Sequence, residues 1–510
     1  MSPTLVHGLD LRSLPPELEE ARAWIEGIAR DHGLQFCETI FEMCNWDEIN
    51  MIASYGGFPT RYPHWRFGME YLRMKTGYEW GLQKIYEMVI NTEPSYAYLL
   101  DNNTFMDQKL VMAHVFGHVD FFQQNAWFKP TNRRMLDEMA NHAARMRRYQ
   151  DRVGVEEVEG FLDACLSIDN LIDPMRPHIA RERPVSEEEA EYDPVLDGPQ
   201  KLPSKTYMDK YINPPEYLEA MRKKAEEERK PDLHFPHEPE RDVLLFLLQH
   251  APLKAWEADV LAIVREEAYY FAPQGQTKIM NEGWASYWHS HMATRHIMTD
   301  AEIVDYADHN SGTLATAPGQ LNPYKMGVEL FRHIEERWNK GRFGKEWLEC
   351  DDPRERREWD TGAMLGREKI FEVRRTHNDV TFIDQFLTPE FVREQGLFAY
   401  EYDKRARQFV VDDREFFAVK QKLLFMLSNH GQPRILVANG NHANRGELEL
   451  IHQWEGLDIQ LDWARETMGN LQRIWRRPVH LVTAIDEKPT VCSHDGTEFK
   501  TQLIGRKKKG

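Results

Sequence analysis

The stretch AHVFGHVDFF, residues 113–122, places two histidines four residues apart among valine and phenylalanine. Positions four apart lie on one face of a helix, so His118 falls about 40° from His114 around the helix axis. Two imidazoles with this spacing can reach one tetrahedral metal ion from a single rigid element. The same spacing also suits two core histidines bonded to backbone or carboxylate groups. We expect Gly117, which has no side chain, to leave room for an ion or a substrate.

A second stretch, MNEGWASYWH at residues 280–289, supplies partners for these histidines. On a helix Glu282 and His289 share a face, so a carboxylate and an imidazole point the same way. We therefore predict that Glu282 joins His114 and His118 around one metal ion. His289 or water would take the fourth position. Imidazole and carboxylate ligands without thiolate make zinc the first choice, with iron or manganese as alternatives.

This prediction carries a geometric condition. Ligand atoms on one ion lie roughly 3 to 4 Å from one another. Even with relaxed side chains, the Glu282 carboxylate should therefore lie within about 8 Å of the imidazoles of His114 and His118. If the histidines are core residues instead, each should have its own partner and Glu282 should lie far away.

Other polar residues could complete such a site. Glu38 and Glu42 fall on one side of either a strand or a helix, so either could act as a catalytic general base, although two surface acids are the alternative. His64 lies in a loop rich in glycine and proline, where binding residues are common, and could bind or support the metal. Tyr324 could donate to an oxyanion or simply pack at a helix start.

Other acids could have different roles. Asp120 points about 140° away from the histidines and is not expected to be a ligand. Glu267 lies in an apolar helical stripe, where an unpaired carboxylate would be costly, so we expect an arginine partner. A di-iron carboxylate centre in a helical bundle is a further arrangement, and it would use Glu42, Glu282 and His289 as well.

The composition excludes several classes of protein. The net charge of −19 and the isoelectric point near 5.6 disfavour nucleic-acid binding and anionic membranes, which need a basic surface. The N-terminus lacks the basic and apolar segments of a signal peptide, and no long apolar run follows, so we expect a cytoplasmic protein without membrane insertion. The five scattered cysteines form no C-x-x-C pair, which argues against a disulfide framework or a zinc ribbon.

The local patterns predict an α+β fold that is mainly helical. Near the N-terminus they predict a helix over 16–30, a strand ending near Met43, a helix capped by Asn45, and a hairpin within 84–104 that leads into the histidine helix. Farther along, helices are predicted over 242–271, 278–298, 322–338 and 461–477, and strands over 434–441, 447–454 and 478–484.

We expect two domains. Residues 1–350 should form a helical domain with a small sheet that holds the metal site. Within it, residues 181–241 are dense in proline and charge and should form an irregular connector with one short helix. Residues 360–510 should form a smaller α+β domain.

The segment NEGWASY, residues 281–287, resembles the Asn-Glu-Gly-x-Ala-x-Tyr segment of aminopeptidase-like gluzincins. In those enzymes the glutamate completes a zinc site begun by His-Glu-x-x-His, which implies a zincin-like arrangement here. Val115 stands where that motif has its glutamate, so the resemblance supplies no general base.

Longer stretches resemble the stage V sporulation protein R (SpoVR) family. They are GGFPTRYPHWRFG at 56–68, the segments 84–125, 154–165 and 276–289, and NPYKMG at 322–327. The resemblance implies a role in spore cortex formation and, in other bacteria, an association with a PrkA-type serine kinase. It names no reaction and no substrate.

Two hypotheses about function follow. One is a metallohydrolase that cleaves an amide bond in a peptide or a peptidoglycan precursor, with the metal activating water and Glu42 or Glu38 accepting its proton. The other is a non-catalytic regulator that keeps a degenerate metal site and binds a kinase or a cell-wall assembly partner.

Overall fold

The computed structural model describes residues 9–79, 86–179, 208–228, 235–316, 320–403 and 408–504. Its fold is α+β and mainly helical, as predicted from the sequence. The contacts divide the chain into two compact units, Met1–Phe161 with Glu266–Gln432, and Leu162–Arg265 with Pro433–Gly510.

This grouping differs from the expected division into residues 1–350 and 360–510. Ile370 and Phe382 are buried in the same hydrophobic cluster as Phe116 and Trp284, which places the segment up to residue 432 with the N-terminal helices. Only the last part of the chain, from Pro433, joins the second unit. The reason is that apolar helical faces in the segment 366–394 find their partners in the first unit.

The first unit contains a four-stranded sheet of order β1-β2-β4-β3. β2 runs parallel to β4, and the other two pairs are antiparallel, including the predicted hairpin of β3 and β4. Asn45 ends β2 and caps α2 in a reciprocal pair of hydrogen bonds with Glu48, also as predicted. The strands are β1 (Arg12–Ser13), β2 (Thr39–Cys44), β3 (Glu87–Ile90) and β4 (Ser95–Leu100).

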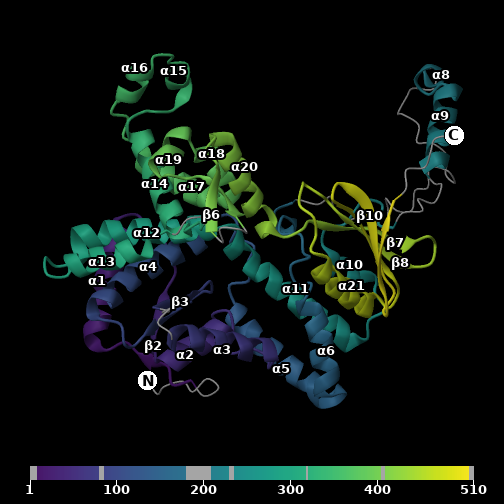
Figure 1. Ribbon diagram of the computed structural model, residues 1–510, viewed down its shortest axis with the longest axis horizontal. Helices are drawn as coiled ribbons and strands as arrows, with labels where there is room; N and C mark the ends of the chain where they lie inside the picture. The colour runs from purple at the N-terminus through teal and green to yellow at the C-terminus, as the bar shows by residue number, and fades with distance from the viewer. Residues whose placement is uncertain are drawn as a thin grey trace. The chain divides into compact units, whose positions relative to one another are not determined.

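Helices make up most of the rest of this unit, with one two-stranded ribbon (Figure 1). They are α1 (Pro16–Asp31), α2 (Trp46–Ser54), α3 (Trp65–Glu79), α4 (Phe105–Gln124), α5 (Met135–Val153), most of α6 (Val155–Leu166), the end of α11 (Ala255–Gln276), α12 (Lys278–Met292), η2 (Ala293–Ile297), α13 (Ile303–Thr313), α14 (Pro323–Asn339), α15 (Gly344–Leu348), α16 (Pro353–Glu358), α17 (Gly366–Thr376), α18 (Asp379–Phe386), α19 (Pro389–Glu394), α20 (Phe416–Leu427) and η3 (Ser428–Gly431), with the ribbon strands β5 (Ala399–Asp403) and β6 (Gln408–Asp413).

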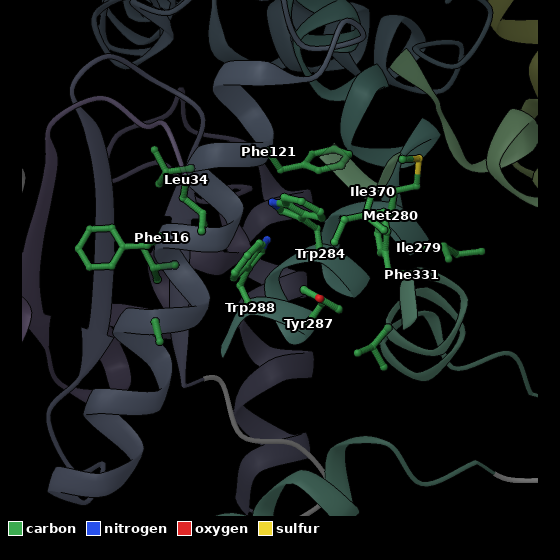
Figure 2. Close-up of a cluster of buried hydrophobic side chains, with 14 of the residues drawn as sticks. Leu34, Phe116, Phe121, Ile279, Met280, Trp284, Tyr287, Trp288, Phe331 and Ile370 are labelled. Atoms are coloured by element: carbon green, nitrogen blue, oxygen red, sulfur yellow. The ribbon is translucent and has the colours of Figure 1, made fainter. Parts of the chain in front are cut away.

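Two aromatic residues of α12 lie at the centre of the core. Trp284 and Trp288 are both fully buried, and Figure 2 shows them between Phe116 on one side and Phe331 on the other. The α12 helix packs against both α4 and α14, which lie beside it in Figure 1. The predicted histidine helix and the predicted NEGWASY helix are therefore direct neighbours.

Glycine sets how closely these helices approach. A Cβ atom at Gly117 of α4 would lie 2.7 Å from Cα of Ala285 in α12. A Cβ atom at Gly283 of α12 would lie 2.4 Å from Cα of Gly327 in α14. The prediction that Gly117 leaves room for an ion or a substrate is wrong, because the backbone of α12 fills that space. Gly117 instead brings the two helices together.

The second unit is built on a five-stranded sheet of order β11-β10-β9-β8-β7. The predicted strands β7, β8 and β9 and the predicted helix α21 are present, whereas β10 and β11 were not predicted because their sequences are short and rich in polar residues. The elements are η1 (Arg176–His178), α8 (Asp209–Ile212), α9 (Pro215–Glu228), α10 (Val243–His250), the start of α11, β7 (Ile435–His442), β8 (Glu447–His452), α21 (Leu461–Trp475), β9 (Val479–Ile485), β10 (Lys488–His494) and β11 (Phe499–Leu503).

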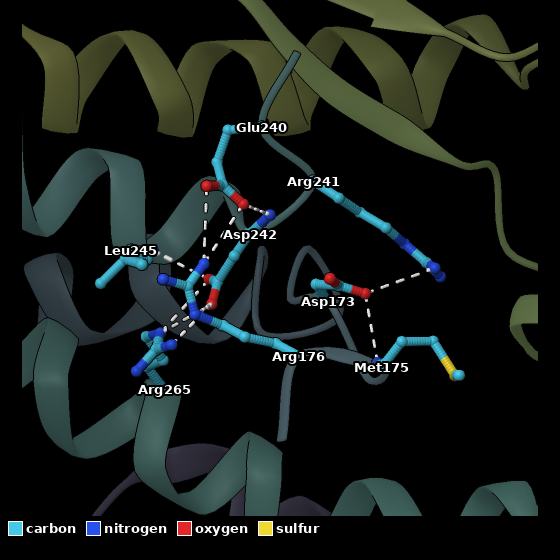
Figure 3. A network of polar contacts seen from close by, with 8 residues as sticks. All are labelled: Asp173, Met175, Arg176, Glu240, Arg241, Asp242, Leu245 and Arg265. Atoms are coloured by element: carbon cyan, nitrogen blue, oxygen red, sulfur yellow. Dashed lines mark hydrogen bonds and ion pairs between the residues drawn. The ribbon is translucent and has the colours of Figure 1, made fainter. Parts of the chain in front are cut away.

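A buried carboxylate anchors the start of α10. Asp242 accepts a hydrogen bond from the backbone amide of Leu245 and forms an ion pair with Arg265 at 2.6 Å (Figure 3). Arg176 approaches the same carboxylate at 3.9 Å. This network lies at the end of the predicted connector 181–241, of which residues 208–228 and 235–241 are described and contain α8 and α9. The rest of the predicted connector lies outside the described residues.

None of the helices in the described ranges combines the length and the apolar composition needed to cross a membrane.

Candidate metal centre

His114 and His118 are both buried on α4, and each has one ring nitrogen held by a residue of α12. Nδ1 of His114 lies 2.8 Å from Nδ1 of His289. Nδ1 of His118 lies 2.9 Å from Oδ1 of Asn281. Because each Nδ1 atom has a partner, each ring presents its Nε2 atom to the space between α4 and α12.

Both Nε2 atoms converge on one carboxylate. Oε2 of Glu282 lies 3.6 Å from Nε2 of His114 and 3.5 Å from Nε2 of His118. One ligand atom from each of these three buried residues lies within 4.8 Å of the other two. The distances fall well inside the limit of about 8 Å that the sequence analysis set.

The Glu282 carboxylate is held in its ionised form. Burial alone would raise the pKa of Glu282, but the adjacent His114 and His118 and the positive charge of Lys278 lower it well below its usual range. Lys278 reaches Oε1, the other oxygen, from one turn earlier on α12. Oε2 itself is buried without a hydrogen-bond partner among the described residues. A buried acceptor of this kind is costly unless a cation or a donor meets it.

The imidazoles of His118 and His289 are held neutral. Burial, and next to it the nearby His114, lower the pKa of His118 to about 4. Burial and His114 also lower the pKa of His289 well below its ordinary value. Neutral imidazole is the form that binds a metal ion, so no proton has to leave His118 near neutral pH.

His289 therefore supports the site rather than completing it. Its Nδ1 atom faces His114, and no atom of His289 belongs to the group that His114, His118 and Glu282 form. Histidines that bind metal commonly hold their other ring nitrogen in a hydrogen bond, which fixes the orientation of the ring, and here His289 accepts or donates that bond. Of the two expected fourth ligands, His289 and water, this contact favours water.

A glutamate that the sequence analysis did not select lies beside the cluster. Oε1 of Glu87, on β3, lies 4.0 Å from Nε2 of His114. Burial raises the pKa of Glu87 above its ordinary value. A signal for this residue was available, because Tyr86, Met88 and Ile90 alternate as one face of the strand and leave Glu87 on the other.

The register of the sheet separates Glu87 from Glu42. Glu87 pairs with Leu99, which is buried in the same cluster as α4, whereas Glu42 pairs with Tyr98, which is buried in the cluster around α2. Successive residues of a strand point to opposite faces, so Glu42 lies on the face away from α4. Among the described residues no hydrogen bond or ion pair joins Glu42, or the exposed Glu38, to the histidines. The structure therefore does not bring either proposed general base to the metal cluster.

Tyr324 and His64 have different positions. The ring of Tyr324, at the start of α14, stacks on His114 with ring centroids 6.2 Å apart. Burial and the charges of Glu282 and Glu87 raise the pKa of Tyr324, so its hydroxyl stays protonated and can donate. His64 lies just before α3, where its ring packs on Phe67, and among the described contacts none joins it to the cluster.

The two other buried acids have partners outside the cluster, and the arginine partner expected for Glu267 is confirmed. Asp120 accepts hydrogen bonds from the backbone amide of Gln35 and from the indole of Trp284, away from the cluster. Glu267 forms an ion pair with Arg61.

The types of ligand atom in the cluster indicate whether a metal ion could bind there. Two imidazole nitrogens and one ionised carboxylate oxygen converge from two helices that Gly117 and Ala285 hold in contact. This is a three-ligand set that zinc accepts in catalytic sites with one open position, and it also suits iron or manganese. The residues present therefore fit a divalent metal ion.

A family model described as SpoVR like protein matches residues 13–432 of the chain. The chain belongs to the SpoVR family. This SpoVR protein is also 27% identical over 508 residues to the uncharacterized protein YcgB of Escherichia coli (strain K12), covering 89% of this chain and 93% of the relative. No solved structure matches it. The family match includes all the residues of the cluster, Glu87 and Tyr324.

Proposed function

We propose that this SpoVR protein is a metal-dependent hydrolase whose ion is bound by His114, His118 and Glu282. The observation that carries the proposal is the convergence of their three ligand atoms within 4.8 Å in a buried site. The unpartnered Oε2 atom of Glu282 supports the same conclusion. Zinc is the first choice of ion, and iron or manganese are the alternatives. The ligand arrangement is zincin-like, with His-x-x-x-His on one helix and glutamate on another.

The residues around the ligands have distinct roles in this proposal. When bound, the ion would polarise a substrate carbonyl and lower the pKa of a water molecule. Glu87, with its raised pKa, accepts the proton of the attacking water and returns it to the leaving nitrogen. The protonated hydroxyl of Tyr324 donates to the oxyanion. His289 and Asn281 hold the two imidazole rings in place.

The substrate that we propose is an amide bond in a peptide or a peptidoglycan precursor, which fits a role in spore cortex formation. A PrkA-type kinase is the proposed pathway partner. The di-iron alternative is less well supported, because Glu42 lies on the far face of the sheet and His289 faces His114.

One observation favours a second function. Val115, at the position of the usual catalytic glutamate, is fully buried in the core and cannot act on a substrate. If Glu87 does not replace that glutamate, the protein is a regulator that keeps the metal site for stability and binds a partner.

Metal content and hydrolysis separate these functions. Protein purified without an affinity tag should contain about one divalent ion per chain by elemental analysis, and His114→Ala and His118→Ala should lose it. Hydrolysis would be measured by mass spectrometry with purified muropeptides as the probe, in water enriched in ¹⁸O, because cleavage of an amide places one ¹⁸O atom in the new carboxylate.

Glu87→Gln should keep the metal and lose the cleavage, while Glu42→Gln, a matched change on the far face of the sheet, should keep both. A metal-loaded wild-type protein without cleavage of any muropeptide would favour the regulator. If the wild type contains no bound metal, both the hydrolase and the metal-stabilised regulator are contradicted.

A further inference from the structure

A second group of metal-type ligands lies outside this cluster, where α5 faces α11. His142 of α5 is completely buried and lies between two consecutive glutamates of α11. Its Nδ1 atom is 3.0 Å from Oε1 of Glu267, and its Nε2 atom is 3.4 Å from Oε2 of Glu266. The two ring nitrogens therefore face different carboxylates.

Glu267 is an ionised carboxylate whose two oxygens both have hydrogen-bond partners. Its Oε2 atom accepts hydrogen bonds from the guanidinium of Arg61 and, at 3.0 Å, from the hydroxyl of Tyr62. Burial alone would raise the pKa of Glu267, but the charge of Arg61 and the hydrogen bond from His142 lower it. Because an ionised carboxylate can only accept, His142 donates its Nδ1 proton to Glu267.

The other nitrogen of His142 faces negative charge without a donor. Nε2 is buried and has no hydrogen-bond partner among the described residues. Glu138 lies one turn before His142 on α5, and His142, Glu138 and Glu266 each offer one ligand atom within 4.8 Å of the other two. With the proton on Nδ1, the buried lone pair of Nε2 lies 3.4 Å from the Glu266 carboxylate, with the Glu138 carboxylate in the same group. That arrangement is unfavourable unless a cation lies between them.

We propose that Glu138, His142 and Glu266 bind a second divalent metal ion. Glu267 would fix the orientation of the His142 ring, as carboxylates do for many metal-binding histidines. One imidazole and two carboxylates form a harder donor set than the two imidazoles and one carboxylate of the first cluster, so the second site suits manganese or iron as well as zinc. The Glu266 side chain is 45% exposed, so an ion can enter from solvent. This proposal does not depend on the function of the first site.

A proton is the alternative occupant. His142 as an imidazolium would satisfy both glutamates of α11 without any metal, since both of its nitrogens would then donate. The two occupants differ in one measurable property, which is whether neutralising Glu138 and Glu266 releases a bound ion.

Manganese binding to the full-length protein tests the proposal. The unbound Mn²⁺ would be counted by electron paramagnetic resonance during titration of chelator-treated protein. Glu138→Gln/Glu266→Gln should bind one ion fewer than the wild type, or bind that ion at least about 10-fold more weakly. Asp137→Asn/Asp151→Asn changes the net charge of the protein by the same amount, at exposed positions of α5, and should bind as the wild type does.

The first site provides an internal comparison. His118→Ala removes a ligand of the first cluster and should leave the ion at Glu138, His142 and Glu266 in place. The proposal is overturned if Glu138→Gln/Glu266→Gln binds the same number of ions as the wild type with the same affinity. It is also overturned if His118→Ala binds no ion. Thermal unfolding with and without Mn²⁺ gives an independent readout, because only a protein with the second site intact should gain stability in the His118→Ala background.

Discussion

The Nδ1 atom of His289 lies 2.8 Å from the Nδ1 atom of His114, which joins α12 to α4 through two imidazoles. Only one of the two nitrogens can carry a proton in a hydrogen bond between neutral rings. The contact therefore fixes the ring of His114 with its Nε2 atom toward Glu282.

We expect His289→Ala to weaken metal binding about 10- to 100-fold without removing any ligand of the ion. Competition with a chromophoric zinc chelator measures the affinity. His64→Ala, which removes another buried histidine outside the cluster, should keep the wild-type affinity. Equal affinities for His289→Ala and the wild type would show that the imidazole pair does not support the site.

The contact between Gly117 and Ala285 predicts that a larger side chain at Gly117 would separate α4 from α12. The added methyl group of Gly117→Ala would meet Cα of Ala285 at 2.7 Å, which is backbone and cannot rotate away. We expect a loss of about 1 to 3 kcal/mol in the free energy of unfolding and weaker metal binding, because α4 and α12 must separate. Urea unfolding and chelator competition measure the two effects.

Gly68→Ala is the matched control for this change. Gly68 lies in α3, and an added Cβ there would have no neighbour within 4 Å. Alanine should therefore leave stability unchanged or raise it by up to about 1 kcal/mol. If both variants behave alike, the close approach at Gly117 does not set the geometry of the site.

The lowered pKa of His118 predicts how stability changes with pH when the metal is removed. An unfolded histidine takes up its proton near pH 6.5, whereas His118 in the folded chain does so near pH 4. Between these values the unfolded state binds more protons, so stability should fall as the pH falls, by at most about 1.4 kcal/mol per pH unit for this group.

Urea midpoints at pH 7, 6 and 5 in the presence of a chelator check this effect. His118→Gln removes the group that titrates and should show a smaller loss of stability between pH 7 and pH 5 than the wild type. The difference between the two proteins isolates His118, since His289 contributes to both. The same loss in both proteins would contradict the lowered pKa.

The contacts of Asp120 predict an effect on the free energy of unfolding. It is fully buried, accepts hydrogen bonds from Gln35 and Trp284, and lies 3.6 Å from Arg374. Asp120→Ala would leave the guanidinium of Arg374 buried without its carboxylate, which should cost about 3 to 5 kcal/mol in the free energy of unfolding. Asp137→Ala, at an exposed position, should change it by less than about 0.5 kcal/mol. A small effect at Asp120 would mean that water or another acid compensates.

Local patterns in the sequence predicted most of the elements and the candidate ligands. The four-residue spacing of His114 and His118, the position of Glu282 on a second helix, and the cap at Asn45 all depend on positions near one another in the chain. A helical or extended repeat imposes such relations wherever the segment lies, so they could be predicted. The family could also be predicted, because its motifs are stretches of sequence.

Tertiary structure alone decided which acid reaches the cluster and what each glycine does. Glu42 and Glu87 are both strand acids, and the pairing of β2, β3 and β4 together with the helix that covers each face puts Glu87 beside His114 and Glu42 on the other side. A shift of one residue in strand pairing moves every side chain of the strand to the opposite face of the sheet. The alternation of residues in the sequence therefore does not predict which face contacts α4. Gly117 likewise lets α12 approach α4 closely, because this helix, distant in the sequence, occupies the space that a side chain would fill. The local repeat fixes which residues share a face, whereas packing between distant segments fixes what that face contacts.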